Sequence, residues 1–99
     1  MGDTPTADDV LSVLRREKSR LEGEYPLHAM WLFGSVARGD ADESSDVDIL
    51  VDVDPNIGLG FVNLAEELER ILERPIDLVS IRAVREDLLR RIGEERLDV

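Results

Sequence analysis

The chain lacks cysteine, and it has few aromatic and few basic residues. The absence of cysteine excludes disulfides and metal sites built from thiolates. No apolar run approaches the roughly 18 residues of a transmembrane helix. The first ten residues, MGDTPTADDV, show neither the basic nor the apolar part of a signal peptide. We therefore expect a cytoplasmic protein.

Acidic residues dominate the charge, with 23 acidic against 12 basic residues and a formal net charge of −11. Such a charge argues against a general affinity for nucleic acid or anionic membranes, so we expect neither as a direct partner. A basic protein, or a nucleotide bridged by cations, is a more natural ligand. The 99 residues are enough for one domain, spanning residues 1–99, and leave no room for a second substrate-binding domain.

The most informative segment is residues 34–48, which read GSVARGDADESSDVD. The Gly34-Ser35 pair is followed by ten residues and then by Asp46 and Asp48, where an apolar run begins. Side chains alternate between the two faces of a strand, so both carboxylates are expected on one face. Mg²⁺ takes oxygen ligands and usually shares one or two carboxylates with substrate phosphates. The pattern therefore indicates phosphoryl or nucleotidyl transfer.

The same segment offers groups that can bind phosphate. Gly34 lets the backbone approach a ligand closely, and Ser35 adds a hydroxyl to successive backbone N–H groups. Arg38 supplies a fork of donors for phosphate oxygens. We predict that these three residues bind the nucleotide, although an ordinary turn after a strand would also explain the Gly-Ser pair.

Hydrophobic spacing and chain breakers predict the secondary structure. Apolar residues at helical spacing predict three helices, over residues 7–23, 61–72 and 83–92. Thr6 is the expected N-cap of the first helix, and Gly93 the expected C-terminal cap of the last. Short apolar runs predict three strands, over residues 27–33, 47–53 and 76–81.

This element order predicts an α+β fold with a small mixed sheet of three strands, or four, flanked by helices. A short loop allows the first two strands to pair antiparallel, whereas a helix crosses between the second and third, as parallel pairs require. If strand 76–81 lies beside strand 47–53, Asp77 can face Asp46 and Asp48. Three carboxylates would then share one site. Asp77 taken alone is weaker evidence, because a single acid can mark a sheet edge.

Other interpretations of the acids and aromatic residues fit less well. A solvated strand face would keep alternate positions polar, and Leu50 breaks that pattern. An EF-hand loop starting at Asp40 would need glutamate at its twelfth position, where the chain has Val51. A P-loop would need Lys-Ser or Lys-Thr at the end of GSVARGDA. We interpret Trp31 and Phe33 as core residues rather than as a base-stacking platform. His28 we interpret as a packing residue of the core or of a strand edge rather than as a catalytic base.

Four segments together resemble the polymerase-beta-like nucleotidyltransferase superfamily, and within it the minimal nucleotidyltransferases (MNT): Gly34-Ser35, residues 37–39 (ARG), residues 45–51 (SDVDILV) and residues 76–79 (IDLV). The resemblance covers nearly the whole chain and implies the nucleotidyltransferase fold. It implies that Gly34 and Ser35 hold the nucleotide phosphates and that Asp46 and Asp48 ligate two Mg²⁺ ions. It also implies that Asp77 binds the catalytic metal and helps to deprotonate the attacking hydroxyl. Arg38 matches a recurring position.

Members similar to this chain are commonly encoded beside a HEPN-domain toxin, a small helical ribonuclease, and act as its antitoxin. The resemblance implies Mg²⁺-dependent transfer of AMP from ATP to a hydroxyl of that toxin, with tyrosine as the expected acceptor, in a hetero-oligomer. Two alternatives stay open. One is a non-catalytic antitoxin that binds and occludes the toxin; the other is an oligomeric nucleotidyltransferase acting on small molecules.

Overall fold

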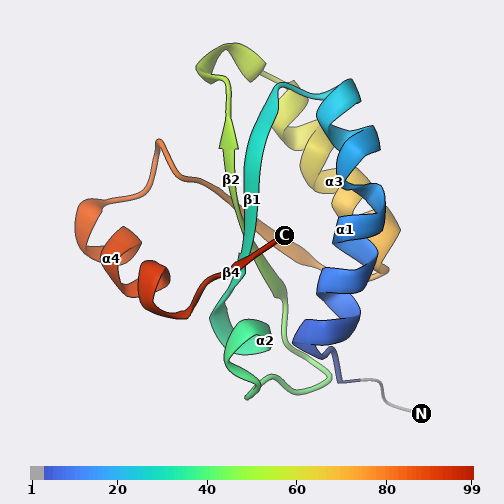
Figure 1. Ribbon diagram of the computed structural model, residues 1–99, viewed down its shortest axis with the longest axis vertical. Coiled ribbons are helices and arrows are strands. Elements are labelled where there is room, and N and C mark those ends of the chain that lie inside the picture. Colours follow the sequence, from blue (N-terminus) through green and yellow to red (C-terminus); the bar gives the residue numbers. More distant parts are fainter. Residues whose placement is uncertain (1–3) are drawn as a thin grey trace.

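A computed structural model describes residues 4–99 (Figure 1). Helices and strands alternate along the chain much as the sequence predicts, which confirms the α+β class. The elements are α1 (Ala7–Glu24), β1 (Leu27–Phe33), α2 (Gly34–Arg38), β2 (Val47–Val53), the 3₁₀ turn η1 (Pro55–Ile57), α3 (Gly60–Leu72), β3 (Ile76–Ser80), α4 (Glu86–Glu95) and β4 (Leu97–Asp98).

The first helix begins where the sequence provides a cap. The Oγ1 atom of Thr6 accepts a hydrogen bond from the Asp9 backbone N–H at 3.2 Å. Asp8 and Asp9 lie in the first turn, where negative charge is favoured by the helix dipole. One side of α1 is buried through Val10, Leu11, Leu14 and Leu21. Neither α1 nor any other helix within residues 4–99 combines the length and the apolar character needed to cross a membrane.

The strands form one mixed sheet in the order β3-β2-β1-β4. β1 and β2 pair antiparallel, and β2 and β3 pair parallel with α3 as the crossover, as predicted. The short strand β4 adds a fourth member by pairing antiparallel with the outer side of β1. The prediction of a small mixed sheet is confirmed, with the fourth strand present.

Helices cover the two faces of this sheet unequally. Figure 1 shows α1 and α3 on one side of the sheet and α4 on the other. The main hydrophobic core includes Val47, Ile49 and Val51, which occupy alternate positions of β2. Leu50 and Ile92 are buried outside that cluster. Because strand side chains alternate, β2 directs its valines and isoleucine toward the main core and Asp48 and Leu50 toward the α4 side.

The last helix differs from its prediction. α4 begins at Glu86 instead of residue 83 and continues to Glu95, so Gly93 lies inside the helix and does not cap it. The Ala83 backbone N–H donates to the Ser80 carbonyl at 3.0 Å, which closes a turn after β3 where the helix was expected to start.

The aromatic residues of β1 also depart from the prediction. Trp31 and Phe33 are only half-buried, and neither belongs to the main core. They occupy the strand positions that point away from α1, and the guanidinium carbon of Arg96 lies 4.9 Å from the centroid of the Trp31 ring. His28 is exposed. The prediction that the two aromatics are core residues is therefore wrong, because the core lies on the opposite face of the sheet.

Candidate active site

The parallel pairing of β2 with β3 brings two of the predicted acids together. Asp48 of β2 is the register partner of Asp77 of β3. Directly paired residues on neighbouring strands point to the same face of a sheet. Asp48 is half-buried, and Asp77, at the edge of the sheet, is exposed. The two carboxyl groups therefore share the face on which α4 lies.

The carboxyl group of Asp48 holds its proton more tightly than an ordinary aspartate. Burial raises the pKa of Asp48 to about 6, together with the negative charges of Asp77 and Asp46 and a hydrogen bond with Asp77. Arg38 acts in the opposite direction. A cation placed between these carboxylates would relieve the repulsion and favour the ionised form.

The third predicted acid, Asp46, lies one residue before β2 and is exposed. Its charge acts on Asp48. Across residues 4–99, however, no group of three or more His, Asp or Glu side chains is arranged to hold a metal ion. The carboxylate oxygens suit Mg²⁺ chemically, and the crowding of negative charge at Asp48 is what a divalent cation neutralises. Binding of an ion by all three acids would therefore require their side chains to move closer together.

Gly34 joins β1 to α2 with a backbone conformation that favours glycine, because its φ angle is +75°. A Cβ atom at this position would lie 2.0 Å from Oδ2 of Asp48, far inside van der Waals contact. The lack of a side chain therefore lets the Asp48 carboxylate lie directly against the backbone. The turn is completed at Gly39, whose φ angle is +85° and whose N–H donates to the Ser35 carbonyl at 3.0 Å.

The donors predicted to bind phosphate converge on an anion supplied by the chain itself. The Gly34 backbone N–H donates to Oε1 of Glu95 at 3.2 Å. The Arg38 guanidinium donates to Oε2 of Glu95 at 3.1 Å and to Asp40 at 3.1 Å. Carboxylate and phosphate oxygens accept hydrogen bonds from the same donors. The contact with Glu95 shows that Gly34 and Arg38 are placed to bind one anion jointly.

These groups border a hollow of about 410 Å³ between the sheet and α4. Four predicted site residues line it: Gly34, Ser35, Arg38 and Asp48. The opposite wall consists of Leu88, Arg91, Ile92 and Glu95 of α4, and Phe33 adds an aromatic ring. Asp46 and Asp77 are not among the lining residues. The hollow thus brings the residues predicted to bind phosphate together with one carboxylate and a wall formed by α4.

The wall formed by α4 was missed from the sequence. Glu95 is 61 residues from Gly34 and 57 residues from Arg38 along the chain, so no local spacing records these contacts. The charges of α4 have the pattern of a solvated face on an amphipathic helix. The sequence contains no further signal that Glu95 contacts Gly34 and Arg38.

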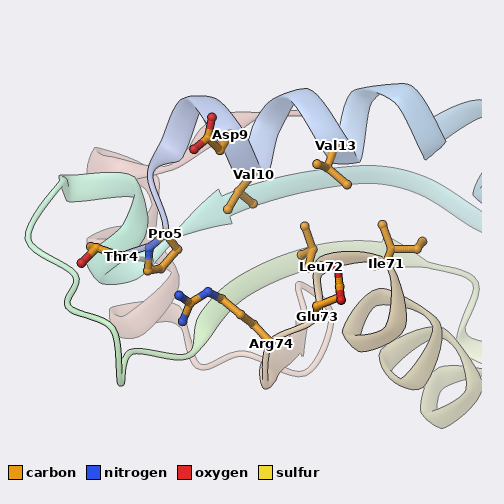
Figure 2. Close-up of a pocket in the computed structure, with 9 residues that line it drawn as sticks. All are labelled: Thr4, Pro5, Asp9, Val10, Val13, Ile71, Leu72, Glu73 and Arg74. Carbon is orange, nitrogen blue, oxygen red and sulfur yellow. The ribbon is translucent and has the colours of Figure 1, made fainter. Parts of the chain in front are cut away.

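A second hollow, of about 240 Å³, lies between the start of α1 and the end of α3. Figure 2 shows Arg74 reaching toward Pro5, with Val10 of α1 on one side and Leu72 of α3 on the other. None of the predicted site residues lines this hollow. It also lacks the glycine turn and Asp48, so we assign the chemistry to the hollow beneath α4.

Sequence comparisons identify relatives of the chain. The family described as Polymerase beta, Nucleotidyltransferase matches residues 18–97, a range that includes every residue of the candidate site. A Methanocaldococcus jannaschii protein assigned as a protein adenylyltransferase is 35% identical over 95 residues, covering 93% of this chain and 95% of the relative. The protein adenylyltransferase MntA of Thermococcus cleftensis is 35% identical over 92 residues, covering 91% of this chain and 92% of that protein.

Solved structures show the same fold. A structure assigned as a minimal nucleotidyltransferase superposes with a TM-score of 0.74 at 29% identity, covering 91% of this chain and 95% of that one. A toxin-antitoxin structure with AMP-PNP superposes with a TM-score of 0.68 at 25% identity, covering 92% of this chain and 69% of that one. Sequence and structural similarity therefore extend over nearly the whole chain.

Proposed function

This chain belongs to the polymerase beta nucleotidyltransferase family, and we propose that it transfers AMP from ATP to a tyrosine hydroxyl of a HEPN-type toxin and so acts as an antitoxin. The observation that carries the proposal is the pairing of Asp48 with Asp77 across parallel strands, directly beside the Gly34 turn. Protein adenylyltransferases at 35% identity support AMP as the transferred group and a protein as the acceptor.

The nucleotide phosphates are assigned to the donors at the end of β1. The Gly34 N–H and the Arg38 guanidinium converge on one anion, and Ser35 lines the same hollow. A backbone N–H and a guanidinium together form charge-assisted hydrogen bonds to phosphate oxygens. These residues would hold the β- and γ-phosphates and leave the α-phosphorus toward Asp48.

The carboxylates of Asp46, Asp48 and Asp77 would hold two Mg²⁺ ions. When bound, the ions lower the pKa of the attacking hydroxyl and neutralise charge on the departing pyrophosphate. Asp48 lies closest to the glycine turn, so its carboxylate joins the phosphate site to the acid pair. Asp77 is exposed at the sheet edge, where an acceptor hydroxyl on another protein can reach it.

The transfer itself is an in-line displacement at the α-phosphorus. The acceptor O–H gives its proton to the Asp77 carboxylate, and its oxygen forms a bond to the α-phosphorus. The bond from the α-phosphorus to the bridging oxygen breaks, and pyrophosphate leaves with the electron pair. The product is an AMP ester of the acceptor residue.

The acceptor protein is assigned from the family and from charge. The toxin-antitoxin structure with AMP-PNP supports both a toxin partner and an adenine nucleotide. The net charge of −11 favours docking onto a basic protein such as a ribonuclease.

Labelled ATP tests the proposal. The protein is incubated with α-labelled ATP, MgCl₂ and the HEPN toxin encoded beside its own gene. We expect label on the toxin, loss of labelling with Asp48→Asn or with EDTA, and loss of labelling when the acceptor tyrosine of the toxin is replaced by phenylalanine. A toxin that stays unlabelled in the presence of the wild-type protein would contradict the proposal. Undiminished inhibition of the toxin by Asp48→Asn would instead favour occlusion without catalysis.

A further inference from the structure

Glu95 is the most informative residue of the hollow that the proposed reaction leaves without a role. Its carboxylate accepts hydrogen bonds from the Gly34 N–H at 3.2 Å and from the Arg38 guanidinium at 3.1 Å. The side chain is 27% exposed. These contacts join the end of α4 to the two donors that we assign to nucleotide phosphate.

The way α4 attaches to the sheet allows the Glu95 side chain to move away from Gly34 and Arg38. Ile92 is the buried residue of α4, and Leu88, one turn earlier, is 39% exposed. Arg96, directly after Glu95, lies over the Trp31 ring, and β4 then pairs with β1. The backbone at Glu95 is therefore anchored, while rotation of its partly exposed side chain alone can release the two donors.

We propose that Glu95 is an internal competitor of the nucleotide, whose carboxylate must leave the Gly34 N–H and the Arg38 guanidinium before a phosphate group binds them. The inference rests on the proposed function for the assignment of these donors to phosphate. It adds a residue that lowers nucleotide affinity and that is no part of the catalytic acids.

Competition follows from the number of donors available. The Arg38 Nη1 group donates to Glu95, whereas its Nε and Nη2 groups donate to Asp40 at 3.1 and 3.4 Å. When Glu95 leaves, Asp40 still orients the guanidinium, and the Nη1 group and the Gly34 N–H become available to another anion. Glu95 is therefore not needed to position Arg38. A carboxylate and a triphosphate beside the same donors would also repel each other.

The size of the effect follows from the strength of the internal contact. Apparent affinity falls in proportion to the fraction of molecules in which the donors are free. Ion pairs that remain partly exposed are weak, so that fraction is reduced only moderately. We expect removal of the Glu95 charge to tighten nucleotide binding by roughly three- to tenfold.

Binding of MgATP and of inorganic tripolyphosphate is measured by calorimetry for the wild type, Glu95→Gln and the matched control Glu94→Gln. Glu94 is exposed and lies next to Glu95 on the same helix, and its side chain makes none of the side-chain hydrogen bonds or ion pairs found among residues 4–99. We expect tighter binding of both probes to Glu95→Gln and unchanged binding to Glu94→Gln. Glu95→Ala, which also removes the hydrogen-bond acceptor, should bind at least as tightly as Glu95→Gln. Circular dichroism confirms that each variant is folded.

Equal or weaker binding of both probes by Glu95→Gln and Glu95→Ala, with a wild type that binds MgATP, would overturn the role of Glu95 and leave the proposed function standing. If the wild type transfers no AMP to its toxin, but Glu95→Gln binds tripolyphosphate more tightly than the wild type does, the proposed function is overturned and the competition by Glu95 is supported. If no variant binds either probe, both proposals fail.

Discussion

The two faces of the sheet use the same central strand for different purposes. Toward α1 and α3, Val47, Ile49 and Val51 are all 0% exposed and belong to the main core. Toward α4, Asp48 is half-buried and borders a hollow. The core face therefore stabilises the fold, whereas the α4 face holds a half-buried carboxylate whose desolvation lowers stability.

The cost at Asp48 has a definite dependence on pH. Its folded-state pKa of about 6 lies above the ordinary value of 3.8, so the unfolded chain releases this proton first as the pH rises. The contribution of Asp48 to the free energy of unfolding therefore falls between about pH 4 and pH 6 and stays low above that range. After allowance for solvent screening, the loss is about 1 kcal/mol. A bound cation would offset it.

The largest effect is expected on the core face. Leu14 of α1 is 0% exposed within the main core, so Leu14→Ala leaves a cavity and should lower the free energy of unfolding by about 2 to 5 kcal/mol. Denaturant unfolding measures the loss. The AMP-transfer activity per folded molecule should stay unchanged. A loss of activity in the folded variant would contradict the claim that the core face serves stability alone.

The next effect concerns activity on the α4 face. Asp48→Asn removes a proposed metal ligand and should lower the rate of AMP transfer by at least about 100-fold. The matched control is Asp52→Asn, which changes the same strand on the same face at the end where Asp52 pairs with Arg82. Initial rates with saturating MgATP and toxin give the comparison. Equal losses in the two variants would argue against a special role for Asp48.

Gly34 lies directly against the Asp48 carboxylate, and replacing it should have an intermediate effect. Gly34→Ala forces a side chain into the positive-φ region and against Oδ2 of Asp48, so we expect a loss of about 1 to 3 kcal/mol in the free energy of unfolding. Gly23 lies inside α1, where a Cβ atom would meet nothing within 4 Å. Gly23→Ala should therefore stabilise the chain by about 0.5 to 1 kcal/mol. The same sign of change in both variants would be inconsistent with this account.

The pH dependence of cation binding gives a smaller effect. Because Asp48 must lose its proton to bind a cation, the apparent Mg²⁺ affinity should fall as the pH drops through about 6, by up to about tenfold per unit below that pH. Calorimetric titration with MgCl₂ at several pH values measures this slope. Asp48→Asn serves as the control, and it should show a much flatter profile.

Local patterns predicted the parts of the molecule that depend on nearby residues. The cap at Thr6, the strand over residues 47–53 and the placement of Asp48 beside Asp77 follow from spacing, breakers and the crossover rule. The predicted start of α4 at residue 83 was wrong because a turn after Ser80 competes with the helix. The contact of Glu95 with Gly34 could not be predicted, because it depends on how a charged helix docks across the sheet. The prediction that Trp31 is a core residue was wrong for a similar reason. Its environment depends on which face of the sheet the helices cover and not on its apolar neighbours in the sequence.

Whether Asp48 is a cation ligand held at a cost in stability is measured by thermal unfolding of the wild type and Asp48→Asn at pH 8, first with EDTA and then with MgCl₂ and a non-hydrolysable ATP analogue. We expect Asp48→Asn to be more stable than the wild type by about 1 kcal/mol in EDTA, because the charge that burial disfavours is gone. Mg²⁺ and nucleotide should then stabilise the wild type and leave the variant nearly unchanged. A variant less stable than the wild type in EDTA, together with equal stabilisation of both proteins by the ligands, would contradict the account.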